Sequence, residues 1–173
     1  MEELITAEEY EILGFLLDFI SEGETECLVL QDETENDFVT GNISLFQKQE
    51  EDLKAIPPVL MLDFVSKNMK SWPLEEEKLK TERKLLLQSP AQLEKAFEIE
   101  GKTGSGWEAF YKKYPESDGQ TVVSRAGFDP GKKEALVYIA GMHDYLCAEG
   151  NLYHLKKSDG KWQLSDIIPL WIS

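Results

Sequence analysis

The chain has few of the residues on which familiar enzyme and metal sites depend. Its 173 residues include only two histidines and two cysteines, and Cys27 and Cys147 belong to no spaced metal-binding or disulfide motif. The sequence also lacks a phosphate-binding loop, a dinucleotide-binding glycine pattern, a Gly-x-Ser-x-Gly elbow and a His-Glu-x-x-His pair. We therefore predict no cofactor, no metal site and no catalytic residue of a recognised type.

Long apolar runs are absent as well. No stretch approaches the roughly 20 apolar residues that a membrane helix needs. The N-terminal segment, MEELITAEEYEILG, is acidic, whereas a secretory signal begins with basic residues. These features predict a cytoplasmic protein that does not bind membranes, although a chain from which a signal has been removed would look the same.

Basic residues are nearly missing from the first part of the chain. Residues 1–52 hold 16 Asp or Glu and a single basic residue, Lys48, whereas residues 53–173 hold 17 acidic and 17 basic residues. The whole net charge of −15 therefore belongs to the first region. Binding to nucleic acid is not expected, because it needs clustered Lys and Arg. The acidic region is explained either by a basic partner protein or by a solvated surface.

Several local signals predict helices and strands. Thr6 and Glu9 form a capping box that opens a helix with apolar residues at helical spacing. Residues 26–32, ECLVLQD, are typical of a strand, and residues 84–88, KLLLQ, are a shorter strand candidate. Ser89, followed by Pro and then by Gln at the third helical position, predicts the start of another helix.

The C-terminal third has the pattern of a β-meander. Residues 120–172 contain four consecutive strand candidates, TVVSRAGF, EALVYIAG, NLYHLKK and KWQLSDII, with Asp159-Gly160 as a hairpin turn. The second candidate is apolar on both faces, as a central strand would be. We predict a single α+β domain over residues 1–173, in which an antiparallel meander sheet of about four to six strands packs against helices on one face.

With these segments identified, the chain resembles a family of small bacterial proteins that has no assigned activity. The resemblance rests on AEEYEILGFLLDFI followed by LVLQDET, on KNMKSWPL, and above all on GWEAFYKKYPESDGQTVVSRAGFD, ALVYIAG and LKKSDGKWQ. These segments are spread over most of the chain. Because the family carries no known activity, the resemblance assigns no role to any residue.

Ser124 and Arg125 are adjacent in the first strand of the predicted meander. Alternation in a regular strand places Val122, Ser124, Ala126 and Phe128 on one face and Arg125 on the other, so Ser124 and Arg125 cannot act together on one small ligand. An Arg that is partly buried in a sheet needs a carboxylate partner or a bound anion. A salt bridge to the acidic N-terminal region is the favoured explanation, and a bound anion is the alternative.

One cluster combines nucleophile, base and metal-ligand types: His143, Asp144, Cys147 and His154. A metal site needs three or four converging ligands, and a Cys-His pair needs a thiol with a lowered pKa. The spacing of these four residues is diagnostic of neither. A histidine in a turn and a packed cysteine explain the pattern equally well.

Two functional hypotheses follow. The first is a non-enzymatic interaction protein whose acidic surface meets a basic partner, in the manner of an inhibitor or immunity protein. The second is a small-ligand binder, or a hydrolase without a familiar motif, with a pocket between an aromatic helix that ends before Pro115 and the sheet. Its candidate ligand-binding residues are Trp107, Tyr111, Arg125, Tyr138 and His143.

Overall fold

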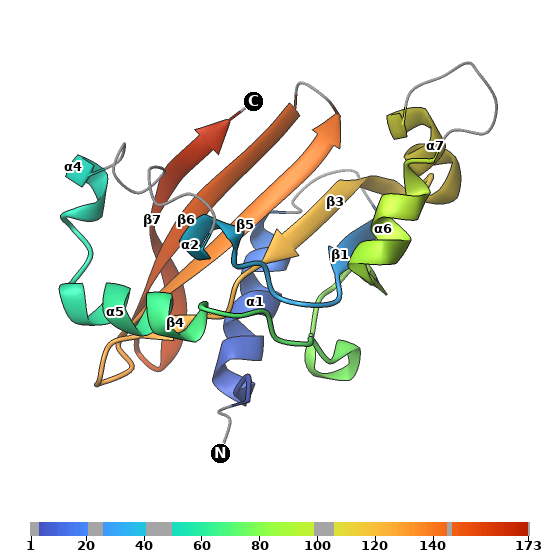
Figure 1. Ribbon diagram of the computed structural model, residues 1–173. Helices are drawn as coiled ribbons and strands as arrows, with labels where there is room; N and C mark the ends of the chain where they lie inside the picture. Colours follow the sequence, from blue (N-terminus) through green and yellow to red (C-terminus); the bar gives the residue numbers. More distant parts are fainter. Residues whose placement is uncertain (1–3, 21–25, 41–49, 99–105, 145–146, 173) are drawn as a thin grey trace.

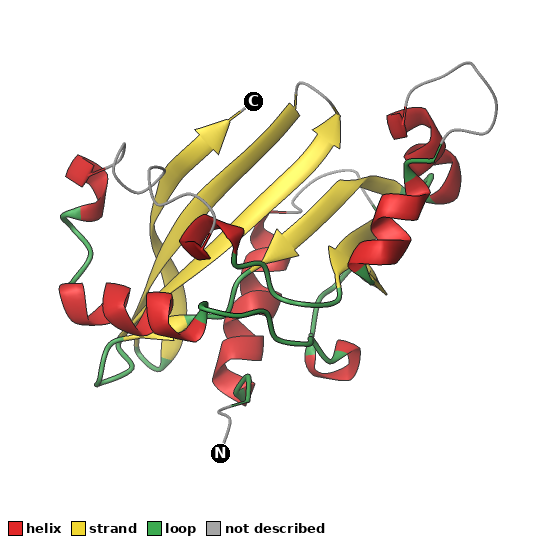
Figure 2. Cartoon of the chain, in the orientation of Figure 1, coloured by secondary structure: helices red, strands yellow, loops and turns green. Residues whose placement is uncertain are grey.

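The chain forms a mixed β-sheet with helices packed along it (Figure 1, Figure 2). The structure is a computed structural model, and it describes residues 4–20, 26–40, 50–98, 106–144 and 147–172. Within these residues the helices are α1 (Ala7–Ile20), α2 (Asp37–Thr40), α4 (Glu50–Leu53), α5 (Pro58–Lys67), the short 3₁₀ helix η1 (Glu76–Lys78), α6 (Pro90–Ala96) and α7 (Gly106–Lys113). The strands are β1 (Cys27–Gln31), β2 (Lys84–Gln88), β3 (Ser117–Val123), β4 (Gly127–Phe128), β5 (Glu134–Asp144), β6 (Cys147–Ser158) and β7 (Lys161–Ile172).

The predicted helix starts of α1 and α6 are both confirmed. At α1 the Thr6 amide donates to Glu9 Oε2 at 2.8 Å, and the Glu9 amide donates to Thr6 Oγ1 at 3.2 Å. At α6 the same reciprocal pair links Ser89 and Gln92, with Pro90 at the first helical position. Each box satisfies backbone N–H groups that a helix start leaves without partners, and this fixes where the helix begins.

The strands form one sheet in the order β2-β1-β3-β5-β6-β7, and β4 pairs with β5 outside this path. β3, β5, β6 and β7 are each antiparallel to the next, so the predicted C-terminal meander is confirmed. Asp159 and Gly160, with φ values of 52° and 76°, form the tight turn between β6 and β7. β1 instead runs parallel to both β2 and β3, so the whole sheet is mixed.

Helices contact both faces of the sheet, which corrects the prediction that they lie on one face. Along β5, Val137 and Ile139 belong to the buried cluster that α1 covers. Leu136 and Tyr138 point the other way, into a cluster with α2 and α5. A third cluster joins α6 and α7 to β1 through Val29. The reason is the composition of β5: a strand that is apolar on both faces must be covered on both.

Candidate functional site

Ser124 and Arg125 lie at a break between β3 and β4, and not in a regular strand. The Tyr138 amide donates to Ser124 Oγ at 2.8 Å. The hydroxyl therefore takes the place of the main-chain carbonyl that would accept this hydrogen bond between two regular strands. The same hydroxyl donates to the Arg125 carbonyl at 2.9 Å. The break reverses the alternation: Val122 belongs to the α5 cluster, but Ala126 belongs to the α1 cluster. The prediction that Val122 and Ala126 lie on the same face of one continuous strand was therefore wrong.

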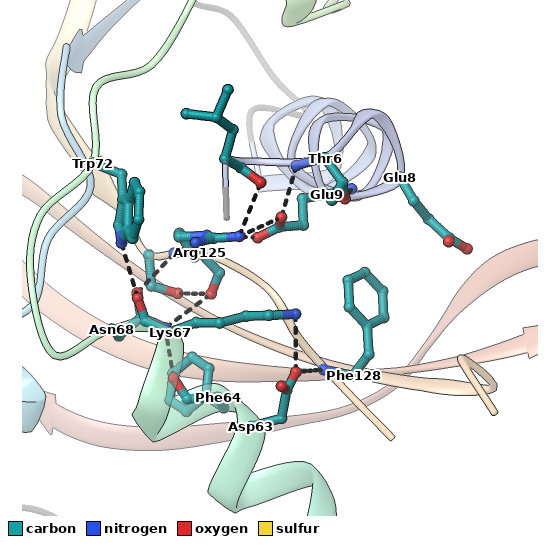
Figure 3. Close-up of polar contacts among 12 residues, drawn as sticks. Thr6, Glu8, Glu9, Asp63, Phe64, Lys67, Asn68, Trp72, Arg125 and Phe128 are labelled. Atoms are coloured by element: carbon teal, nitrogen blue, oxygen red, sulfur yellow. Dashed lines mark hydrogen bonds and ion pairs between the residues drawn. The ribbon is translucent and has the colours of Figure 1, made fainter. Parts of the chain in front are cut away.

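Arg125 forms a buried ion pair with Glu9 of α1 (Figure 3). Its Nε donates to Glu9 Oε1 at 3.0 Å and its Nη2 to Glu9 Oε2 at 2.8 Å. The exposed fraction is 0% for Glu9 and 1% for Arg125. The predicted salt bridge to the acidic N-terminal region is confirmed. The Glu9 carboxylate therefore accepts hydrogen bonds both from the Thr6 amide, in the capping box of α1, and from the Arg125 guanidinium.

The surroundings of Arg125 enclose it completely. Its backbone amide donates to Asn68 Oδ1 at 2.9 Å, and Asn68 Nδ2 donates to the Arg125 carbonyl at 3.1 Å. The guanidinium carbon lies 4.8 Å from the centre of the Trp72 ring, a cation–π contact, and Nη2 donates to the Leu4 carbonyl at 3.3 Å. A side chain enclosed in this way does not reach a ligand in solvent. Arg125 joins α1, the α5 C-terminus and the break after β3.

The aromatic residues predicted to line a pocket are distributed over different clusters. Trp107 and its neighbour Phe110 are buried against α6 and β1, so this face of α7 is filled by packing. Tyr138 lies in the α5 cluster, stacked on Phe38 with ring centres 4.2 Å apart. Trp171 Nε1 donates to the Tyr138 hydroxyl at 2.7 Å, but burial raises the pKa of Tyr138 to about 12.

Tyr111 and His143 are brought together. The Tyr111 hydroxyl donates to the His143 carbonyl at 2.6 Å, and the Tyr111 ring also contacts that of Trp107, with centres 5.8 Å apart. Of the five predicted ligand-binding residues, Trp107, Tyr111 and His143 are therefore neighbours. Arg125 and Tyr138 lie elsewhere, in separate clusters.

A cavity of about 90 Å³ opens beside His143, and we call it the His143 cavity. The strands β1, β3, β5 and β6 and the last residue of α1 contribute to its walls. Its apolar part includes Ile139 of the α1 cluster, so the cavity lies on the α1 side of the sheet. Its polar lining side chains are those of Asp118, Thr121, His143, Glu149, Asn151 and Tyr153.

His143 has a defined orientation at this cavity. Its Nδ1 contacts the main-chain carbonyl of Asp118, and the Asp118 carboxylate lies 3.6 Å from the same nitrogen. A carbonyl oxygen only accepts hydrogen bonds, so Nδ1 must carry a hydrogen. In the neutral ring Nε2 is then an acceptor. Nε2 lies beside Gly141, because a Cβ built on that glycine would be 3.5 Å from it.

A second concavity, the α2–α5 groove, is larger and apolar. It has a volume of about 740 Å³ and lies among α2, α4 and α5. Its apolar lining includes Val39, Leu53, Ile56, Met61, Val65 and Met69, and Lys54 also lines it. Near it, Leu62 and Met69 are 68% and 59% exposed. Two methionines in one groove provide a soft surface that can adapt to different apolar side chains.

The acidic residues of region 1–52 occupy two separate places. On α1, Glu8, Glu11 and Asp18 lie on the side away from the sheet core, and Glu8 pairs with Lys157 at 2.9 Å. Apart from the buried Glu9 and from Glu26, which precedes β1, the other acidic residues whose side chains are described follow β1 or lie in α2 and α4: Asp32, Glu33, Glu35, Asp37, Glu51 and Asp52. The second group shares two of its helices with the α2–α5 groove.

The cluster of possible metal ligands is divided. His154 Nε2 contacts Glu134 Oε1 at 3.0 Å, at the other end of β5 from His143. Cys147 pairs with Asp144 across β5 and β6. Within the described ranges, no group of three or more His, Cys, Asp or Glu side chains is placed to hold a metal ion. None of the described helices is long and apolar enough to cross a membrane.

No protein-family model, curated protein or solved structure matches this chain. The resemblance to a bacterial family therefore stays a prediction.

Proposed function

We propose that this protein is a non-enzymatic interaction module that binds a basic partner protein through the α2–α5 groove. The observation that carries the proposal is an apolar groove of about 740 Å³ on the same two short helices as a group of acidic side chains. Exposed apolar patches with a polar rim are typical of protein-binding surfaces. Lys54 also lines the groove, but Asp37, Glu51 and Asp52 lie on its two short helices, and their charges favour a partner segment that presents apolar side chains flanked by Lys or Arg.

The alternative is a small-ligand binder or hydrolase with a pocket between α7 and the sheet, and it has less support. The aromatic face of α7 packs against α6 and β1, where Phe110 is fully buried. Arg125, one of its candidate ligands, is enclosed by Glu9, Asn68 and Trp72. The groove instead includes Met69, an apolar side chain that the described part of the protein leaves exposed, and the exposed Leu62 lies near it on α5.

Binding of a designed helical peptide of Leu and Lys, measured by fluorescence anisotropy, tests the proposal. We expect saturable binding that weakens at least about tenfold between about 50 mM and 500 mM NaCl, because salt screens exposed charges. A peptide with Glu in place of Lys should not bind. If the Lys peptide binds with no dependence on salt, or does not bind, the proposal fails.

Charge reversal distinguishes the groove from general attraction to an acidic protein. Glu51→Lys with Asp52→Lys reverses two charges on α4, which carries one wall of the groove, and removes the exposed Glu51–Lys54 pair. Glu76→Lys with Glu77→Lys makes the same change in net charge on η1. The α4 variant should bind the Lys peptide about tenfold or more weakly than the η1 variant. Equal losses in the two variants would mean that the groove is not the binding site.

A further inference from the structure

The polar groups around the His143 cavity are mostly hydrogen-bond acceptors. In the neutral ring of His143, Nε2 is an acceptor because Nδ1 carries the hydrogen that contacts the Asp118 carbonyl. The carboxylates of Asp118 and Glu149 accept hydrogen bonds and carry negative charge. No Lys or Arg is among the described residues that line the cavity. A ligand of this cavity must therefore supply donors and positive charge.

Two buried residues of β6 complete the lining. Asn151 is 9% exposed and Tyr153 is 5% exposed, and the Asn151 side chain hydrogen-bonds to the Tyr153 hydroxyl. This bond lowers the pKa of Tyr153. The Asn151 amide carries one acceptor, Oδ1, and one donor group, Nδ2. Burial has the larger effect and raises the pKa of Tyr153, so its hydroxyl stays protonated at neutral pH.

The size and the apolar part of the cavity limit the ligand further. One water needs about 10 to 15 Å³, so a cavity of about 90 Å³ has room for about six to nine non-hydrogen atoms. Leu28 and Ile139 supply an apolar wall from the α1 cluster. Gly141 leaves space directly beside His143 Nε2. The cavity therefore suits a short carbon chain that ends in a charged group with several N–H donors.

We propose that the His143 cavity binds the ammonium group of a small aliphatic amine. Its N–H donors meet His143 Nε2, the Glu149 carboxylate and Asn151 Oδ1, and its carbon chain lies against Leu28 and Ile139. This site is on the α1 side of the sheet and is independent of the α2–α5 groove, whose cluster lies on the other side. Failure of one proposal does not affect the other.

Titration of the full chain with n-butylammonium chloride, followed by calorimetry and by ¹H–¹⁵N spectra, tests the proposal. For a ligand of five non-hydrogen atoms we expect a Kd between about 10 μM and 1 mM. n-Butanol has the same shape without the charge, and tetramethylammonium has the charge without N–H donors. Both should bind at least about tenfold more weakly, because charge-assisted hydrogen bonds are lost. The proposal is wrong if either compound binds as tightly as butylammonium, or if butylammonium shows no saturable binding.

Two variants locate the binding site. Glu149 is exposed, so Glu149→Gln should fold normally and weaken butylammonium binding about tenfold. Gly141→Val places methyl groups beside His143 Nε2, where even a Cβ would lie at 3.5 Å, and should abolish binding. Gly131→Ala adds a methyl group in a turn where its nearest neighbour lies at 3.6 Å, and is the control that should bind normally. Unchanged binding in Glu149→Gln overturns the assignment of the site, whether or not Gly141→Val folds.

Discussion

Removing either member of the Glu9–Arg125 pair should destabilise the protein severely. Both side chains are buried, and two hydrogen bonds of 2.8 and 3.0 Å join them. A single substitution leaves the other charge buried without its partner, which costs about 3 to 5 kcal/mol in the free energy of unfolding. Glu9→Gln is the more informative change, because the glutamine keeps an oxygen for the Thr6 amide and so preserves the capping box of α1. Arg125→Met keeps most of the side-chain volume and removes the charge.

The double variant, Glu9→Gln with Arg125→Met, separates charge from packing. With both charges gone, we expect its free energy of unfolding to lie within about 2 kcal/mol of wild type. The coupling energy of the double-mutant cycle is then about 4 kcal/mol or more. Urea unfolding followed by circular dichroism and tryptophan fluorescence measures all four proteins.

The neighbouring residue Glu8 provides a matched control. It lies on the same helix and pairs with Lys157 at 2.9 Å, but both side chains are partly exposed. Glu8→Gln should therefore cost less than about 1 kcal/mol. The reasoning is refuted if Glu9→Gln costs no more than Glu8→Gln, or if the two single losses at Glu9 and Arg125 simply add in the double variant.

Three further predictions concern the core around β5. Ser124→Ala should cost about 1 to 3 kcal/mol, because the buried Tyr138 amide loses its acceptor at 2.8 Å, and hydrogen exchange of that amide should accelerate. Gly127→Ala would place a Cβ 2.5 Å from the Phe64 Cα and should cost about 1 to 3 kcal/mol in thermal unfolding, whereas Gly131→Ala, in open surroundings, should cost less than about 0.5 kcal/mol. Burial raises the pKa of Tyr138 to about 12. The contribution of this residue to the free energy of unfolding should therefore be constant below the ordinary tyrosine pKa near 10, and it should fall by up to about 2.7 kcal/mol as the pH rises through 12. An ultraviolet titration of Tyr138→Phe should lack the latest tyrosine step of the wild type, and an unchanged curve in that variant would contradict the assignment.

The features that were predictable from sequence depend on neighbouring residues. The capping boxes at Thr6 and Ser89 and the Asp159-Gly160 turn were predicted and are confirmed, because each is defined by a few residues whose side chains or φ angles act locally. The antiparallel order of the C-terminal strands followed from the short turns between them.

The features that were not predictable depend on residues far apart in the chain. A five-residue apolar strand such as β1 carries no signal for its direction, so its parallel pairing with β2 was missed. The break at Ser124 was missed because the alternation of side chains that is typical of a strand continues through it in the sequence. The strand pairing is interrupted there by one hydroxyl group, Ser124 Oγ, which accepts from the Tyr138 amide, and no sequence pattern marks it. His143 was predicted as a candidate, but its cavity also requires Gly141 and Asn151, which no motif connects.

The position of β1 has a consequence for how the chain folds. Ser158 pairs with Lys161 across a two-residue turn, so β6 and β7 can associate as soon as both have been synthesised. Cys27 pairs with Lys84 on one side and with Ser117 on the other, so β1 enters the sheet only after two long loops close. Loop closure costs entropy before the contacts form, and such non-local pairing slows folding. We expect the C-terminal hairpins to form first and the docking of β1 to set the folding rate, so that substitutions in β7 act mainly on the early nucleus and those in β2 on the final step.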